Sequence, residues 1–183
     1  MATTAGTNTY TQRLIGAAAL DAAIYEEVEA DRGATAQACA VVLLSSVAAG
    51  VGARGLGGIS PSNIAFISIV ALLAWAAWAL LTYEIGVRLL PEPQTSADVG
   101  ELLRTIGFAS APGILRVFGV LPGVTVPVFA VTAVWMLAAM IVAVRQALDY
   151  TSTARAIAVC VLGWVLALVI AVGIGLVFGP KVS

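Results

Sequence analysis

Long apolar runs dominate the pattern of this chain. Residues 33–53, 64–81, 124–144 and 156–178 are each apolar over roughly the 20 residues that an α-helix needs to cross the hydrocarbon core of a membrane. The stretches between them contain glycines, prolines or charged residues that end a helix, such as PEP at residues 91–93. The pattern therefore predicts four membrane-spanning helices.

A fifth apolar segment, residues 106–121, is shorter than a usual span and contains Pro112 at its middle. It predicts either a short, broken crossing or a re-entrant hairpin. The basic residues favour a crossing, because short cytoplasmic loops carry the excess of Lys and Arg. Five crossings leave Arg54 and Lys181 on one side and put most arginines on the other. That second group consists of Arg13, Arg32, Arg88, Arg104, Arg145 and Arg155. A cytoplasmic N-terminus follows.

The segment before the first span, residues 10–31, predicts one amphipathic helix. Leu20, Ile24 and Val28 recur at a spacing of four, which places them on one face. We expect this helix to lie along the membrane surface or to pack under the bundle. Its acidic end has the wrong sign for attraction to anionic headgroups and forms a candidate docking surface. The acidic residues are Glu26, Glu27, Glu29 and Asp31.

Together these patterns predict an all-α fold, a polytopic transmembrane bundle of about five spans. Residues 1–32 are expected to form a cytoplasmic segment and residues 33–183 the transmembrane domain. The composition agrees, because 61% of the 183 residues are hydrophobic, 10% are charged and the mean hydropathy is +1.02. The expected location is the inner or cytoplasmic cell membrane, as a multi-pass protein.

The same composition argues against several classes of function. A net charge of −1 without a basic tract does not suit nucleic acid. There is no His, and Cys39 and Cys160 lie inside apolar runs, so neither a metal site nor another cofactor is expected. A Ser or Cys nucleophile would lack a base, since Lys181 is the single lysine and stands near the end. We therefore expect no enzymatic activity.

Charged residues near the ends of the spans form a candidate polar cluster. Glu84 and Arg88 are four residues apart, as are Arg145 and Asp149, so each pair can meet on one helix face. They predict either a cluster that joins spans or separate anchors in the headgroup region. The candidate residues are Glu84, Arg88, Arg104, Arg116, Arg145, Asp149 and Arg155.

Arg116 allows two different predictions of its role, because a charge within a membrane segment is costly and needs a reason. It is expected either to line a substrate or ion pathway or to have a structural role. In the structural role it snorkels to the headgroups or pairs with a carboxylate, for which Glu84 and Asp149 are the candidates.

Two features predict close helix packing. The irregular backbone at Pro112 is tolerated at membrane depth only where protein or water surrounds it. In the last span a small residue stands at every fourth position, which lets helices approach within the bundle or between two copies. These residues are Gly163, Ala167, Ala171, Gly175 and Gly179.

Three stretches of this chain resemble the bacterial branch of the Yip1 family. They are LDAAIYEEVEADRGATAQA, LLRTIGFASAPGILRVFG and VWMLAAMIVAVRQALDYTSTARAIAV. The resemblance implies a helical membrane bundle with a cytoplasmic N-terminus. Eukaryotic relatives bind small GTPases through an Asp-Leu-Tyr-Gly-Pro motif, whereas DAAIYEE at residues 21–27 lacks the Gly-Pro, which leaves GTPase binding doubtful.

Two hypotheses for function follow. The first is a structural or interaction protein that contacts membrane lipids and binds other membrane proteins, or itself, or organises the bilayer. The alternative is a small transporter or channel component, or an accessory subunit of an export complex, in which Pro112 and Arg116 line a pathway. A dry, packed interior favours the first, and a polar cavity that reaches Arg116 favours the second.

Overall fold

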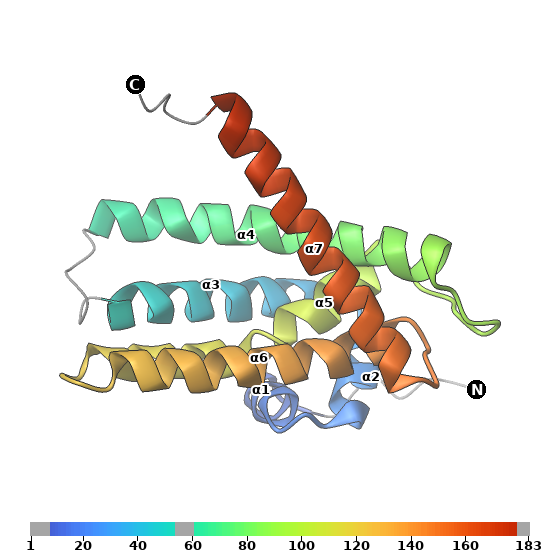
Figure 1. The fold of residues 1–183 in the computed structure, drawn as a ribbon. Coiled ribbons are helices and arrows are strands. Elements are labelled where there is room, and N and C mark those ends of the chain that lie inside the picture. The colour runs from blue at the N-terminus through green and yellow to red at the C-terminus, as the bar shows by residue number, and fades with distance from the viewer. Residues whose placement is uncertain (1–7, 54–60, 179–183) are drawn as a thin grey trace.

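The computed structural model describes residues 8–53 and 61–178, and within these ranges all regular structure is helical (Figure 1). The predicted all-α bundle is confirmed. Three stretches of the described residues are long and apolar enough to cross a membrane, namely α3, α6, and Ile69–Leu89 in the second part of α4 and the turns after it. The long helices are α3 (Ala34–Gly52), α4 (Pro61–Tyr83), α6 (Thr125–Ala147) and α7 (Thr153–Phe178).

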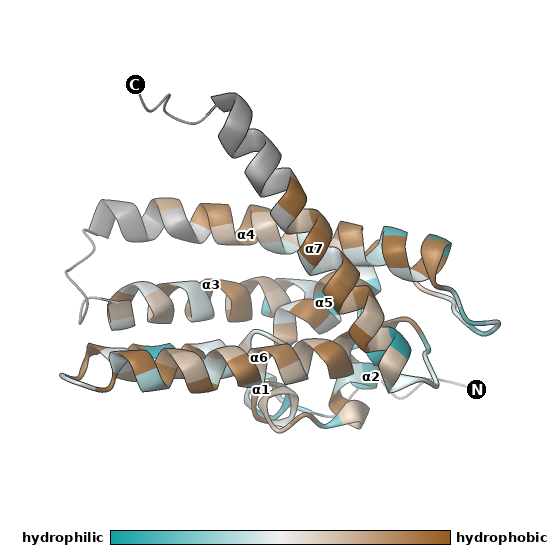
Figure 2. Cartoon of the chain, in the orientation of Figure 1, coloured by the Kyte–Doolittle hydropathy of each residue, from teal (hydrophilic) through white to brown (hydrophobic). Residues whose placement is uncertain are grey.

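Polar residues gather at one end of the bundle, hereafter the polar end (Figure 2). It includes the π-helix η2 (Glu84–Leu89), the loop after it and the start of α7. The outside of the long helices is apolar instead, and large side chains such as Leu73, Val134 and Trp164 are exposed there. An apolar exterior of this extent is typical of a protein surrounded by lipid.

The broken segment runs beside α3 for the whole length of that helix. It consists of α5 (Val99–Phe108) and the 3-10 helix η3 (Ala111–Val120). Ten residues of 3-10 helix rise about 20 Å, against about 15 Å for ten residues of α-helix, which compensates for the short apolar run. Gly107 lies against the first half of α3, and Gly119 against Gly52, its last residue. The segment does not turn back, so it crosses the bundle.

The N-terminal segment forms two helices, and the single amphipathic helix predicted over residues 10–31 is wrong. A turn separates α1 (Tyr10–Ala18) from α2 (Ala22–Ala30), and Leu20 has a left-handed φ of 64° within it. Asp21 starts the second helix, because its carboxylate accepts a hydrogen bond of 3.0 Å from the backbone N–H two residues later.

Both N-terminal helices pack under the bundle, one of the two places expected for this segment. Figure 1 shows α1 nearly end-on beside α6, so its axis lies across the direction of the long helices. Trp135 of α6 donates a hydrogen bond of 2.6 Å to the carbonyl oxygen of Ala18, and the buried Tyr25 hydroxyl donates one of 3.0 Å to that of Ala17. These donors bind carbonyl groups in the last turn of α1, where the helix ends; the carbonyl oxygen of Ala17 also accepts from the backbone N–H of Leu20 at 3.1 Å.

Candidate functional site

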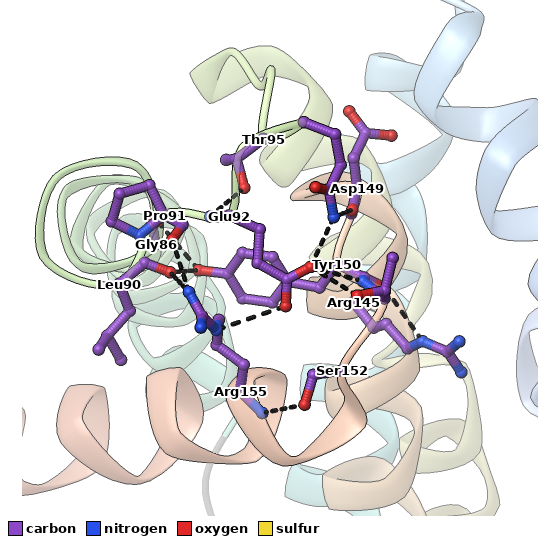
Figure 3. Close-up of polar contacts among 12 residues, drawn as sticks. Gly86, Leu90, Pro91, Glu92, Thr95, Arg145, Asp149, Tyr150, Ser152 and Arg155 are labelled. Atoms are coloured by element: carbon purple, nitrogen blue, oxygen red, sulfur yellow. Dashed lines mark hydrogen bonds and ion pairs between the residues drawn. The ribbon is translucent and has the colours of Figure 1, made fainter.

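Tyr150 connects the α6–α7 turn to the end of α4. Its ring is buried, and its hydroxyl lies 2.9 Å from the carbonyl oxygen of Gly86 and 2.8 Å from that of Leu90, so it donates to one at a time (Figure 3). These carbonyls belong to η2 and its C-terminal cap, where the last turn of a helix leaves acceptors open. A Cβ at position 86 would lie 2.9 Å from Leu148 Cδ2, so glycine is needed for this contact.

Glu92 is the buried acceptor beside Tyr150, and the PEP pattern predicted only a helix end here. Its carboxylate accepts hydrogen bonds from the backbone N–H of Thr151 at 2.9 Å and from its hydroxyl at 2.8 Å, and it pairs with Arg155, Nε to Oε1 3.3 Å (Figure 3). The Thr151 hydrogen bonds hold the pKa of Glu92 below its usual value, although burial opposes them. We call Glu92, Tyr150, Thr151 and Arg155 the junction cluster.

Arg104 lies at the polar end but serves a different purpose, as a cap for α2. The side chain is buried, and its Nε donates to the carbonyl oxygens of Val28 at 3.0 Å and Glu29 at 2.9 Å. Those carbonyls end α2, where the helix dipole favours a cation. Arg104 therefore fixes α2 onto α5.

Arg145 and Asp149 border a polar pocket of about 400 Å³ between α2 and the α6–α7 turn. The helix ends at Ala147 and Asp149 has a left-handed φ of 53°, so the spacing of four does not bring the two side chains together. Arg145 Nε instead donates to the carbonyl oxygen of Tyr150 at 3.3 Å. The pocket is lined by Glu26, Glu29, Arg145, Gln146, Asp149, Tyr150 and Thr151.

Glu84 and Arg88 form an ion pair of 3.1 Å in η2, and both side chains are exposed. A pair in this setting contributes about 0–1 kcal/mol, because water and salt screen it. This pair has no contact with the junction cluster and links only two turns of η2.

Arg116 lies away from the other candidates, so the predicted cluster of seven is wrong in this member. Its carbonyl oxygen contacts Gly52, because the 3-10 helix carries it toward the end of α3 opposite the polar end. Its Nε donates to the Thr132 hydroxyl at 3.2 Å, and its guanidinium lies 5.4 Å from the ring centroid of Phe129. Neither carboxylate proposed as its partner is among these contacts.

A second buried cation, Arg13, joins the three N-terminal helices. Its guanidinium lies 2.8 Å from Glu27 and 2.8 Å from Asp31, and it also donates to Gln37 at 3.1 Å. Burial disfavours its charge, but the two carboxylates outweigh burial and raise the pKa of Arg13, and the hydrogen bond from Arg13 lowers the pKa of Asp31. Half of the acidic surface predicted for docking is thus occupied within the protein.

Close backbone packing is found along the broken segment, where no stripe had been predicted. Gly107, Gly113 and Gly119 stand at every sixth position, and a Cβ at Gly107 would lie 2.7 Å from that of Ala38. Pro112, beside the middle glycine, is fully buried. The facing residues of α3 stand at every seventh position: Ala38, Ser45 and Gly52. Six residues of mixed α and 3-10 helix rise about as far as seven of α-helix, so the two series stay in register.

The stripe predicted in α7 is described only at its start. Gly163 is buried against Trp78, whose Cη2 would lie 3.0 Å from a Cβ at position 163, and Ala167 is half-buried. The surroundings of Ala171 and Gly175, and the whole of Gly179, lie outside the described residues.

A family model described as the Yip1 domain matches residues 21–174. This range runs from the start of α2 into the second half of α7, and it includes the broken segment and the junction cluster. The comparison with curated proteins found no match, and neither did the comparison with solved structures. Because the matched residues make up most of the chain, the protein belongs to the Yip1 domain family.

Proposed function

We propose that this membrane protein is a non-enzymatic scaffold, whose bundle binds other membrane proteins or organises the bilayer around it. The observation that carries the proposal is the packing at the break in the helical backbone. A Cβ at Gly113 would overlap Ser45 of α3 and lie 2.9 Å from the Met136 sulfur of α6, and Pro112 is buried beside it. A break closed by side chains suits a rigid body, whereas a pathway needs water at this depth.

The charged side chains support the same proposal. Arg104 caps a helix, Arg155 pairs with Glu92, and Arg13 pairs with two carboxylates. Each of these groups holds segments together, which is a structural use of charge rather than a catalytic one. Arg116 contacts a hydroxyl and an aromatic ring of α6.

For orientation, we propose that the polar end faces the cytoplasm. Arg88, Arg104, Arg145 and Arg155 belong to η2, α5, the end of α6 and the start of α7, which meet there, and basic residues concentrate on the cytoplasmic side of membrane proteins. Partners then dock at the polar end, where the loops and α2 are accessible.

In-cell photo-crosslinking tests the scaffold role. A photoreactive amino acid at Thr153, exposed at the polar end, should give discrete adducts with the same membrane proteins that copurify in gentle detergent. The same probe at Val126, exposed at the other end of α6, is the control and should not give these adducts. The transporter alternative gains support if neither site gives adducts while Arg116→Ala alters solute uptake at unchanged thermal stability.

A further inference from the structure

An apolar groove runs between α6 and α7 on the outside of the bundle. Its volume is about 460 Å³, within the range of about 300–1,000 Å³ that is typical of small-molecule sites. α7 runs obliquely across the long helices (Figure 1). Trp164 forms part of the groove wall, and its ring centroid lies 6.1 Å from that of Trp78 in an edge-on contact. The main lining residues are Val134, Leu137, Ile141, Cys160, Val161 and Trp164.

Arg145 stands at the polar end of this groove. Val134, Leu137 and Ile141 share one face of α6, and Arg145 extends that face by one further turn. Its side chain is exposed, and beyond the Nε bond to Tyr150 its guanidinium nitrogens have no partner among the described residues. A cation placed where an apolar groove meets the headgroup region suits a phosphate.

Beyond Arg145, the polar pocket is short of a positive charge. Glu26, Glu29 and Asp149 line it. The Glu26 carboxylate accepts a hydrogen bond of 2.8 Å from Gln146, and the Glu29 carboxylate has no hydrogen bond to a described residue. Burial, followed by the charges of Glu101, Asp149 and Glu26, raises the pKa of Glu29 to about 8, against a weaker opposing effect of Arg104. A ligand cation in this pocket would relieve the repulsion.

From this arrangement we propose a binding site for one phosphatidylethanolamine molecule. An acyl chain occupies the α6–α7 groove, the phosphate lies at Arg145, and the primary ammonium enters the polar pocket of Glu26, Glu29 and Asp149. The order of the apolar groove, Arg145 and the acidic pocket between α2 and the α6–α7 turn matches the order of acyl chain, phosphate and ammonium in the lipid.

The same charges discriminate between headgroups. A phosphatidylglycerol has no cation for the polar pocket, and its anionic headgroup is repelled by the carboxylates of Glu26 and Asp149, which Glu29 joins as it ionises around its pKa of about 8. The quaternary ammonium of a phosphatidylcholine carries no N–H group to donate to them. The site does not rest on the proposed scaffold role, because it concerns lipid on the outside of the bundle.

Native mass spectrometry of the intact protein in detergent tests the proposal. The protein is equilibrated with an equimolar mixture of phosphatidylethanolamine, phosphatidylglycerol and phosphatidylcholine. We expect one retained phosphatidylethanolamine, with a preference of about tenfold or more over the other two, which corresponds to about 1.4 kcal/mol.

Paired variants locate the lipid. Arg145→Gln removes the phosphate contact and Val134→Trp fills the groove, so both should abolish the preference. Two controls should keep the preference for phosphatidylethanolamine. Arg88→Gln removes another exposed cation of the polar end, and Val126→Trp adds a tryptophan on α6, the helix that carries Val134. Val126 and Val134 are 68% and 70% exposed, so the two tryptophans differ in place and not in burial. Unchanged melting temperatures show that the variants are folded.

Three results would overturn the site. Equal retention of the three lipids would show that no headgroup is recognised, and a preference for phosphatidylglycerol would show that the carboxylates do not bind a cation. A dimer that Val134→Trp dissociates would show that the groove holds a second copy of the chain. Partner adducts from Thr153 are measured separately, so failure of the lipid site and failure of the scaffold role remain distinguishable.

Discussion

At the scale of single residues, buried polar side chains in this protein serve the ends of helices. The hydroxyls of Tyr25 and Tyr150, the indole of Trp135 and the guanidinium of Arg104 all donate to carbonyl groups that helices leave open. Tyr25, Tyr150 and Arg104 are buried, so removing one of these donors leaves a buried carbonyl oxygen with one partner fewer. Asp21, which caps α2, and Tyr25 thus have structural roles.

Tyr150→Phe tests how much such a side-chain donor contributes to stability. It removes the hydroxyl donor that the carbonyl oxygens of Gly86 and Leu90 share, although that of Leu90 keeps Arg155 Nη1 at 3.4 Å, and should lower the free energy of unfolding by about 1–3 kcal/mol at unchanged packing. At about 2–4 °C per kcal/mol for a chain of this size, a melting assay in detergent resolves the loss. Tyr83→Phe is the control, since the Tyr83 hydroxyl has no hydrogen bond to a described residue. Equal melting of the two variants would contradict the role of Tyr150.

Glu29 makes the stability depend on pH. Its pKa is about 8 in the folded protein, mainly through burial, and about 4.5 in the unfolded chain. As pH rises between these values the unfolded chain ionises first, so the folded state loses stability that is fully present below the lower value. Glu29→Gln should therefore stabilise the lipid-free protein near pH 8.5 by about 1 kcal/mol after solvent screening, and have little effect near pH 5.

Thermal melting at the two pH values measures this difference. Glu84→Gln, at an exposed ion pair, is the control and should show no such pH-dependent gain. A Glu29→Gln variant whose melting temperature differs from that of the native protein by the same amount at both pH values would contradict the shifted titration.

At the scale of elements, the hydrophobic pattern predicts the long helices and misses the irregular ones. Hydropathy records how many apolar residues follow one another, and this is enough for α3, α4 and α6. It does not record helical pitch, so it predicted neither the 3-10 geometry of η3 nor the six-residue spacing of the glycines along the broken segment. The α1–α2 break was missed because Leu20 keeps the spacing of Ile24 and Val28 across the turn.

The close contact between Gly113 of η3 and Ser45 of α3 predicts that one substitution can compensate for the other. Gly113→Ala places a methyl group on the Ser45 side chain and should lower the free energy of unfolding by about 1–3 kcal/mol. Ser45→Gly in the same chain removes the obstacle and should recover part of that loss. Val117→Ala, on a half-exposed face of η3, is the control and should be better tolerated. Additive effects of the two substitutions in a melting assay would contradict the contact.

At the scale of the whole molecule, only part of the charged site was predicted, because its members come from segments that are distant in the sequence. Arg155 and Arg104 were found from their place at helix ends, whereas Glu92 and Arg13 acquire their partners only when loops and N-terminal helices fold back. A spacing rule describes one helix and cannot report such contacts. The crossing of the broken segment has the widest consequence, since it decides which loops share a side.

Cysteine accessibility in intact cells tests that crossing. In a background of Cys39→Ala and Cys160→Ala, single cysteines are placed by Gln94→Cys before α5, by Leu121→Cys after η3, and by Ala154→Cys at the start of α7. All three positions lie in loops or at a helix start and are exposed. With the polar end in the cytoplasm, an impermeant thiol reagent should label the cysteine at position 121 alone, and the other two only after permeabilisation. Labelling of position 154 alone, with positions 94 and 121 protected, would mean that the segment returns to its own side, and so would labelling of positions 94 and 121 with position 154 protected. Labelling of positions 94 and 154, with position 121 protected, would keep the crossing and reverse the proposed orientation.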